Sequence, residues 1–271
     1  MKLLQNLHTH TRYCDGRDTP EEMIKAAIEK GFESIGFSGH SYTDFDAVSS
    51  MSPEDTERYK AEVRGLAEKY RDQIKVFCGI EYDYYSDFDT SDFDYVIGSL
   101  HALKIGDNYY GVDCTCEKTA RLINEHFGGD GYVFARAYYN TLATLPERGK
   151  FDILGHFDLI TKYHAKVSFF DEETREYRAP ALEAISAIKG KIPFFEVNSG
   201  AIGRGYRSTP YPDPFFIKEF KKQGFGAVIT SDCHNSSWLD IGYKESATLL
   251  KECGYKEIYI LTENGFEGRK I

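Results

Sequence analysis

The chain has 271 residues, of which 41% are hydrophobic and 28% are charged, so it can bury the core of one large domain. Its formal net charge of −10 counts against long nucleic acids and anionic membranes as partners, because both favour a basic protein surface. No apolar run approaches the roughly 18 residues of a membrane span, and the N-terminus shows no signal peptide. The six cysteines are scattered without a CxxC pair, as is typical of reduced thiols, so we expect a cytoplasmic protein.

Short apolar strands alternate with helical stretches along the chain. Strands are expected at 3–8, 34–38, 74–81, 95–99, 151–156, 194–198 and 227–232, with a short last strand at 257–261. Helices are expected at 20–31, 53–70, 115–145 with a break at 128–131, 180–189, 213–224 and 245–253. Repeated strand–helix units predict an α/β fold with a parallel sheet, and seven of them favour a closed barrel. Since no Pro/Ser-rich linker divides the sequence, we expect a single domain over residues 1–271.

The segment LHTHTRYCDG, residues 7–16, follows the first predicted strand. On an extended strand, residues two apart point to the same side, so His8 and His10 would aim at one place. Asp15 could return toward that place from the following loop. Near the other end of the chain, SDCH repeats the arrangement with Asp232 and His234.

Polar residues mark the carboxyl ends of the other predicted strands as well. The full set of candidate metal ligands is His8, His10, Asp15, His40, Glu81, His101, His156, Asp232 and His234. In a β/α barrel these strand ends share one face, where active sites are built. Imidazole and carboxylate together suit zinc, iron or manganese, and the set is too large for one tetrahedral ion. The sequence therefore predicts two or three divalent metal ions with Glu81 as a bridge, whereas His126 and His164 lie outside the pattern.

These motifs resemble the polymerase and histidinol phosphatase (PHP) family. The matching segments, in family order, are HTHTRYCDG at 8–16, SGH at 38–40, GIE at 79–81, SLH at 99–101, GHFD at 155–158 and SDCH at 231–234. The resemblance implies a distorted seven-stranded (β/α)7 TIM-like barrel with a three-metal site at the C-terminal ends of the strands. It also implies three ligand sets: His8, His10, Glu81 and Asp232 for the first metal; Glu81, His101 and His156 for the second; Asp15, His40 and His234 for the third.

Within the family, EVNSG at 196–200, an arginine-containing loop and YPDP look most similar to histidinol-phosphate phosphatases. This similarity implies hydrolysis of L-histidinol phosphate to L-histidinol and phosphate, a reaction of histidine biosynthesis. Arg204 and Arg207 in that loop are candidate phosphate contacts, because arginine binds phosphate in a bidentate manner. The acidic and aromatic stretches 41–46 and 81–95 could receive the cationic tail of this small phosphorylated substrate.

The hypothesis for the mechanism is attack on phosphorus by a hydroxide that bridges the first and second metals. Asp232, His234 or a metal-bound water could protonate the leaving group, and the sequence does not choose between them. Three alternatives stay open. One is another PHP phosphoesterase, acting on nucleotides or oligonucleotide 3′ ends. Another is an amidohydrolase barrel, although no lysine fits the pattern, and the last is a non-enzymatic, metal-stabilised binding module. The sequence predicts no particular oligomeric state.

Overall fold

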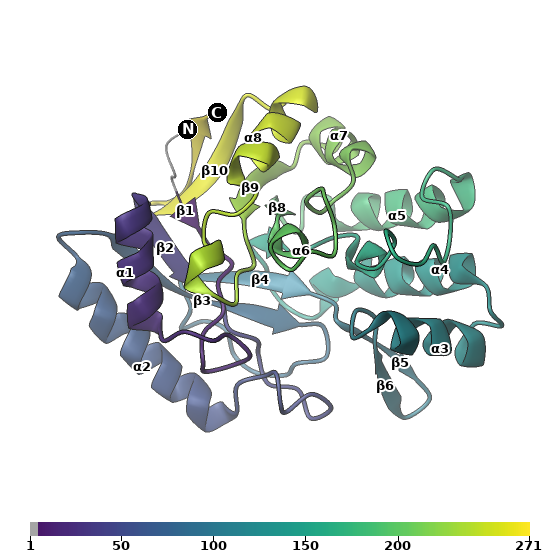
Figure 1. Cartoon of the computed structure of the whole chain (residues 1–271), viewed down its shortest axis with the longest axis horizontal. Helices are drawn as coiled ribbons and strands as arrows, with labels where there is room; N and C mark the ends of the chain where they lie inside the picture. The colour runs from purple at the N-terminus through teal and green to yellow at the C-terminus, as the bar shows by residue number, and fades with distance from the viewer. Residues whose placement is uncertain (1–4) are drawn as a thin grey trace.

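The computed structural model describes residues 5–271, and its centre is a seven-stranded parallel sheet (Figure 1). In sheet order, the strands are β1 (Gln5–Asn6), β2 (Ser34–Phe37), β3 (Lys75–Asp83), β4 (Tyr95–Ser99), β7 (Ile153–Leu154), β8 (Phe194–Asn198) and β9 (Gly226–Thr230). The first and last strands meet just beyond their ends, where the backbone N–H of His10 donates to Cys233 O at 2.9 Å. The predicted seven-stranded barrel is therefore confirmed, and residues 3–4 of the first predicted strand lie outside the described residues.

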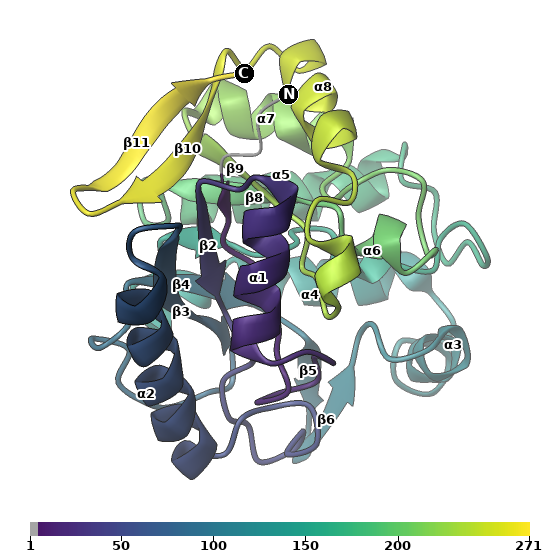
Figure 2. The same cartoon turned by 60° about the vertical axis from the view of Figure 1, so that its left-hand side comes forward.

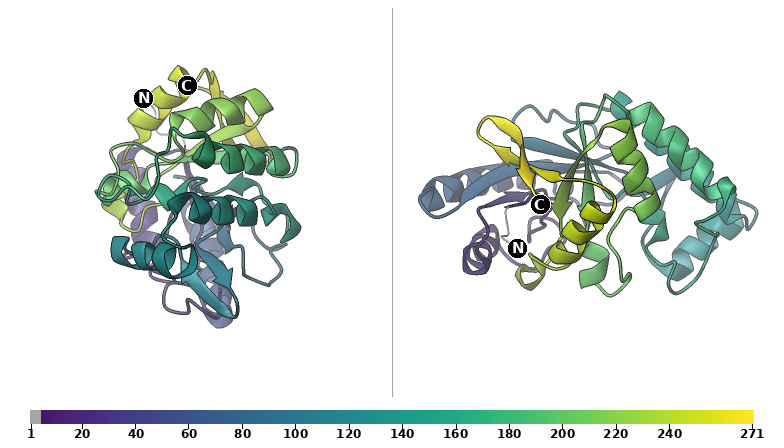
Figure 3. Two further views of the ribbon diagram at one scale, coloured as in Figure 1. Left: turned by 90° about the vertical axis from the view of Figure 1, so that its right-hand side faces the viewer. Right: turned by 90° about the horizontal axis from the view of Figure 1, so that it is seen from above.

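Helices connect the strands and cover the barrel from outside. They are α1 (Pro20–Lys30), α2 (Pro53–Tyr70), α3 (Cys116–His126), α4 (Gly131–Leu142), α5 (Arg175–Ile188), α6 (Gly200–Gly203), α7 (Pro214–Gln223) and α8 (Tyr243–Glu252), with short 3₁₀ turns η1 (Leu145–Glu147), η2 (Leu159–Thr161) and η3 (Ser236–Trp238). The left view of Figure 3 shows the teal and green helices α3, α4 and α5 in front of the strands. Within residues 5–271, no helix is both long and apolar enough to cross a membrane.

The start of α5 differs from the prediction. The helix was expected to begin at Pro180 but begins at Arg175, because the Thr174 side chain caps it by accepting from the Tyr177 N–H. Pro180 then lies inside the helix. A threonine cap six residues before Pro180 thus decides the boundary, although proline is the commoner first-turn residue.

Two antiparallel hairpins extend the barrel. The hairpin of β5 (Ala102–Ile105) and β6 (Asn108–Gly111) was not predicted, nor was β11 (Gly265–Lys270), which pairs with the expected strand β10 (Glu257–Thr262). Figure 2 shows the two hairpins at opposite ends of the molecule, with β10–β11 in yellow at the top. The β5–β6 hairpin directly follows His101 and therefore lies on the side of the barrel where the predicted ligands gather.

The barrel interior has its own small apolar cluster, separate from the larger core under the helices. The members of this interior cluster are Leu7, Phe77, Tyr95, Ile97, Ile153, Val228 and Leu261. Tyr95 spans the interior, since its hydroxyl lies 2.5 Å from Leu7 O and 2.9 Å from Phe37 O and can donate its one proton to either. Gly79 makes room for that ring, because a Cβ there would lie 2.3 Å from Tyr95 Cζ. A side chain at Gly79 would therefore displace Tyr95 from the centre of the barrel.

Gln5 joins the last hairpin to the first strand. Its side chain imitates a strand pair with Leu261: Nε2 donates to Leu261 O at 2.9 Å, and Oε1 accepts from the Leu261 N–H at 2.7 Å. Nε2 also donates to Ser34 Oγ on β2 at 2.8 Å. The amino-terminal end of the barrel is thus filled by apolar side chains, and the hydrogen-bonded amide of Gln5 ties its strands together. The opposite end is left for polar side chains.

Candidate metal centre

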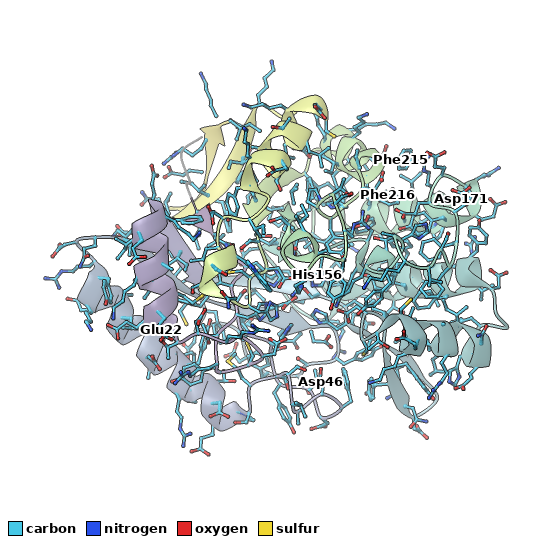
Figure 4. The ribbon with its side chains drawn as sticks, viewed as in Figure 1. Glu22, Asp46, His156, Asp171, Phe215 and Phe216 are labelled. Carbon is cyan, nitrogen blue, oxygen red and sulfur yellow. The ribbon has the colours of Figure 1, made fainter. Side chains whose placement is uncertain are left out.

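The predicted ligands come together at the carboxyl ends of the barrel strands. Each lies at or just after a strand except Asp15, which enters from the loop between β1 and α1. Figure 4 marks His156 near the middle of the molecule, where these strand ends meet. Three overlapping groups have ligand atoms within 4.8 Å of one another, and they are His8, His10 and Asp232; His40, Glu81 and His101; and His10, Asp15, His40 and His234.

Glu81 belongs to the second group and turns its two carboxylate oxygens toward different histidines. Its Oε1 is 3.0 Å from His156 Nε2 and 3.3 Å from His101 Nε2. Its Oε2 is 2.9 Å from His40 Nδ1, 3.2 Å from His8 Nε2 and 3.5 Å from His10 Nε2. His156 thereby joins the site through Glu81, although it belongs to none of the three groups. A carboxylate placed in this way has the geometry of a bridge between two ions.

The centre of this arrangement contains buried polar atoms without hydrogen bonds. Among the described residues, His8 Nε2, His10 Nε2 and Glu81 Oε2 are buried and form none. Buried polar atoms nearly always have a partner, so converging acceptors without one fit a cation between them. The donor set of imidazole and carboxylate suits divalent transition metals. The residues present therefore fit divalent metal ions.

Asp15 gathers the third group near the edge of the site. Its Oδ2 is 3.1 Å from His234 Nε2, and its Oδ1 is 3.6 Å from His40 Nε2. The rings of His10 and His234 stack with their centroids 4.2 Å apart. The Asp15 side chain keeps 37% of its surface exposed, more than any residue that it pairs with in this group. This group is consequently the one most open to solvent.

The electrostatics of the site keep its carboxylates ionised and His10 neutral. Burial alone would raise the pKa of Glu81, but His8 and His40 outweigh it and hold that pKa well below its usual range. Burial also raises the pKa of Asp232, and the opposing effect of Arg204 and His8 prevails. For His10, burial and the neighbouring histidines together lower the pKa to about 3. The two carboxylates are therefore charged and His10 is neutral. For His8, burial lowers the pKa, but Glu196 and Glu81 outweigh it and raise that pKa, so an ion bound there would have to displace a proton.

Asp232 has an unusual backbone conformation. Its φ is 44°, and it is the only residue other than glycine with a positive φ among residues 5–271. Such conformations persist where the surroundings enforce them, and they gather at functional sites. Here Oδ1 faces His10 Nε2 at 3.2 Å, and Oδ2 accepts from Arg204 Nη2 at 3.0 Å. The turn thus presents one oxygen to the ligand cluster and the other to an arginine.

A cavity of about 290 Å³ opens above the ligand cluster. Besides predicted ligands, it is lined by Phe45, Asp46, Asp83, Asp113, Lys162 and Arg204. Arg204 also lies 3.1 Å from His234 through Nη1. Arg207 is not among the lining residues: its Nη1 donates to Thr161 Oγ1, and its guanidinium lies 4.8 Å from the centre of the Tyr211 ring. Of the two predicted arginines, the structure therefore places one at the cavity.

Reasoning from the sequence missed several polar residues of the site. Lys162 Nζ donates to Asp113 at 2.8 Å from Oδ2 and 2.9 Å from the backbone O, so a second cation lines the cavity. Two further carboxylates contact the histidines from behind: Glu196 accepts from His8 Nδ1 at 2.8 Å, and Asp83 lies 3.1 Å from His101 Nδ1. Glu196 carried a signal, since an acid in the middle of the apolar strand FFEVN is unusual.

The acidic and aromatic stretches divide between two hollows. Phe45, Asp46 and Asp83 line the cavity above the ligand cluster. Tyr85 and Phe88 instead line a neighbouring cleft of about 560 Å³ together with several aspartates. Only part of the two stretches is thus in a position to meet a substrate bound over the ligand cluster.

The sequence profile of the PHP domain matches residues 6–200, which is most of the chain. The chain therefore belongs to the PHP domain family, and the resemblance noted in its motifs is confirmed. It is similar to the histidinol-phosphatase of Bacillus subtilis (strain 168), with 27% identity over 269 residues that cover 91% of this chain and 98% of the relative.

Two solved structures share the fold. One is a histidinol phosphate phosphatase from Lactococcus lactis in complex with zinc, L-histidinol and phosphate, with a TM-score of 0.76 and 21% identity over 97% of this chain and 99% of that one. The other is a proposed histidinol phosphatase from Listeria monocytogenes, with a TM-score of 0.77 and 20% identity over 89% of this chain and 99% of that one. At these identities the similarity supports the barrel.

Proposed function

We propose that this chain is a metal-dependent phosphatase that hydrolyses L-histidinol phosphate to L-histidinol and phosphate, a step of histidine biosynthesis. One observation carries the proposal: a cluster of imidazole and carboxylate ligands lies at the base of a cavity that Arg204 and Lys162 also line. The similarity to the Bacillus subtilis histidinol-phosphatase over nearly the full length of both chains supports the substrate. The net charge of −10 argues against a nucleic-acid substrate.

The proposed metal content is three divalent ions, of zinc, manganese or iron. In this scheme the first ion takes His8, His10, Glu81 and Asp232; the second takes Glu81, His101 and His156; and the third takes Asp15, His40 and His234. Ions held there would lower the pKa of a bound water and balance charge on the phosphoryl oxygens. The two-sided placement of Glu81 supports the shared ligand, because each of its oxygens faces a different set of histidines.

The two cations of the cavity bind the phosphate in this proposal. Arg204 is held by Asp232 and can offer its fork of N–H groups to two phosphoryl oxygens. Lys162 is held by Asp113 and adds a point charge from another segment. Together they orient the ester and counter its negative charge. Asp232 and His234 remain the candidates for moving a proton to the leaving oxygen, since both line the same cavity.

The outer part of the cavity suits the rest of the substrate. Histidinol carries an ammonium group and an imidazole, and Asp46 and Phe45 line the cavity on a loop separate from Arg204. A carboxylate and an aromatic face favour cationic groups. Figure 4 marks Asp46 on its loop, below His156 in that view. The phosphate and the cationic tail would thus contact different walls.

Steady-state kinetics test the substrate. The full chain is assayed on histidinol phosphate and, as matched esters, on ribose 5-phosphate, AMP and p-nitrophenyl phosphate. We expect kcat/KM for histidinol phosphate to exceed that for the other esters by about 10²-fold or more, because a site that pairs polar groups of its substrate rejects analogues without them. Equal values for all four esters would contradict the assignment of substrate.

Metal removal tests the class of enzyme. Dialysis against a chelator should abolish turnover, and adding Mn²⁺, Zn²⁺ or Fe²⁺ to the metal-free protein should restore it. Metal content is measured by inductively coupled plasma mass spectrometry in the same samples. Full turnover by a protein verified to be free of metal would contradict a metal-dependent mechanism.

A further inference from the structure

Glu196 is a buried carboxylate that joins four parts of the barrel end. Its side chain lies on β8 and is 1% exposed. Oε2 accepts from His8 Nδ1 and from Thr230 Oγ1, both at 2.8 Å. Oε1 accepts from the backbone N–H of His156 at 2.6 Å and from Asn198 Nδ2 at 2.9 Å. Each oxygen therefore has two donors, and the strands on both sides of β8 contribute.

A charge in this place is unfavourable for folding alone. Both oxygens of Glu196 accept hydrogen bonds from two donors each, which leaves no acceptor to which a carboxyl proton could be donated, so the side chain is a carboxylate. Removing an ion from water carries a large desolvation penalty, and apolar residues of similar volume often stabilise a protein at least as well. The carboxylate is therefore better explained by what it does to its neighbours than by stability.

Its most informative neighbour is His8. Because Glu196 accepts at Nδ1, the proton of a neutral His8 ring stays on Nδ1 and the lone pair stays on Nε2. That Nε2 faces Glu81 Oε2 at 3.2 Å and Asp232 Oδ1 at 3.6 Å, and it forms no hydrogen bond among the described residues. We infer that Glu196 is a positioning residue that fixes the tautomer and the orientation of His8 for the first metal. The inference rests on the proposed metal site.

Asp83 provides an internal comparison. It lies 3.1 Å from His101 Nδ1, just as Glu196 contacts His8 Nδ1. His101, however, faces the other oxygen of Glu81. His156 has no such carboxylate, and its Nδ1 is buried without a hydrogen bond within the described residues. Each outer carboxylate thus backs a histidine on a different side of Glu81. Loss of Glu196 should weaken the ion on the His8 side, and loss of Asp83 the ion on the His101 side.

The test measures zinc affinity in the full chain, with E196Q compared with T230V. Both substitutions keep the side-chain volume and disturb the same carboxylate site, but only E196Q changes the group that holds His8. Zinc is titrated against a chromophoric chelator, and the melting temperature of each metal-free protein is recorded. We expect E196Q to weaken one of the bound ions by about 10- to 100-fold, while T230V stays within about twofold of the wild type.

Several results would overturn the inference. One is zinc binding by E196Q as tight as in the wild type, and another is an equal loss in T230V, which would indicate a general disturbance of packing. E196D keeps the buried charge but withdraws it from His8, so it should lose zinc affinity, and no loss in E196D would also contradict the inference. Wild-type protein that takes up no zinc would instead overturn the proposed function, and this inference with it.

Discussion

Arg204 and Arg207 lie three residues apart in the sequence, but their surroundings differ. Arg204 contacts Asp232 and His234 at the cavity, whereas Arg207 contacts Thr161 and Tyr211 behind it. The same side chain can thus act on the substrate in one place and support a loop in the other.

Substituting each arginine separates the two roles. R204A should lower kcat/KM by about 10- to 100-fold, since a hydrogen bond to a charged group contributes about 1.5–3 kcal/mol. R207A should keep most of kcat/KM and lower the free energy of unfolding, because its loss leaves buried partners unpaired. Kinetics and urea unfolding of both variants check this. An equally large kinetic loss in a stably folded R207A would contradict the distinction.

Gly200 supports the turn at Asp232 by leaving space. A Cβ at this position would lie 2.9 Å from Asp232 Cβ, 2.9 Å from Arg204 Nη2 and 3.0 Å from Ser231 O. G200A should therefore shift both functional side chains, and a displacement of about 1 Å can lower activity by about 10²-fold. Overpacking should also cost about 1–3 kcal/mol of unfolding free energy.

The control for this substitution is G65A in α2. A Cβ at Gly65 would meet nothing within 4 Å, so alanine should stabilise the helix by up to about 1 kcal/mol and leave kcat unchanged. Kinetics and thermal unfolding of both variants provide the measurement. Normal activity in G200A would show that the turn at Asp232 tolerates displacement.

At the scale of elements, α1 and α2 are linked by a charged contact. Glu21 Oε1 accepts from Lys69 Nζ at 2.6 Å and from Tyr70 Oη at 2.7 Å. The hydrogen bond from Lys69, followed by the one from Tyr70, lowers the pKa of Glu21 to about 2. A carboxyl with a lowered pKa stabilises the fold above its ordinary pKa, and this stabilisation is lost as the pH falls through the folded value.

E21Q should therefore be less stable than the wild type at pH 6, and the difference should shrink as the pH falls from 4.5 toward 2. The effect is small, because the contact is at the surface and salt screens it. Urea unfolding at a series of pH values measures it. E29Q in the same helix is the control, since Glu29 has no ion pair among the described residues. A constant difference between E21Q and the wild type across this range would contradict the assignment.

The elements that could be predicted are those with a local signal. Strands such as β4 were recognised from short apolar runs, and α1 from Pro20 and Gly31 at its ends. The β5–β6 hairpin was missed because its strands are only four residues each and partly exposed, so they have no apolar run. Asp113 follows that hairpin, and its contact with Lys162 depends on a fold that the sequence does not display locally.

At the scale of the whole molecule, the ligand cluster could be predicted because a barrel collects its strand ends on one face. That rule alone was enough to predict that His8 and Asp232 lie in the same cluster. Glu196 did not follow from it, because it lies inside β8 instead of after its end, and its contact with His8 depends on the packing across the barrel. The single domain over residues 1–271 and the ligand roles stay predictions, and the metal experiments above address the latter.

The seam between the first and last barrel strands has a consequence for the order in which the protein folds during synthesis. His10 pairs with Cys233 across this seam, so the site is made from the two extremes of the barrel sequence. A ribosome must deliver almost the whole barrel before Asp232 and His234 can meet the histidines made at the start. Contacts of such high sequence separation form late and slowly. Ion uptake should therefore be among the last events of folding. Bound ions should hold the first and last barrel strands together and slow unfolding at the seam between them.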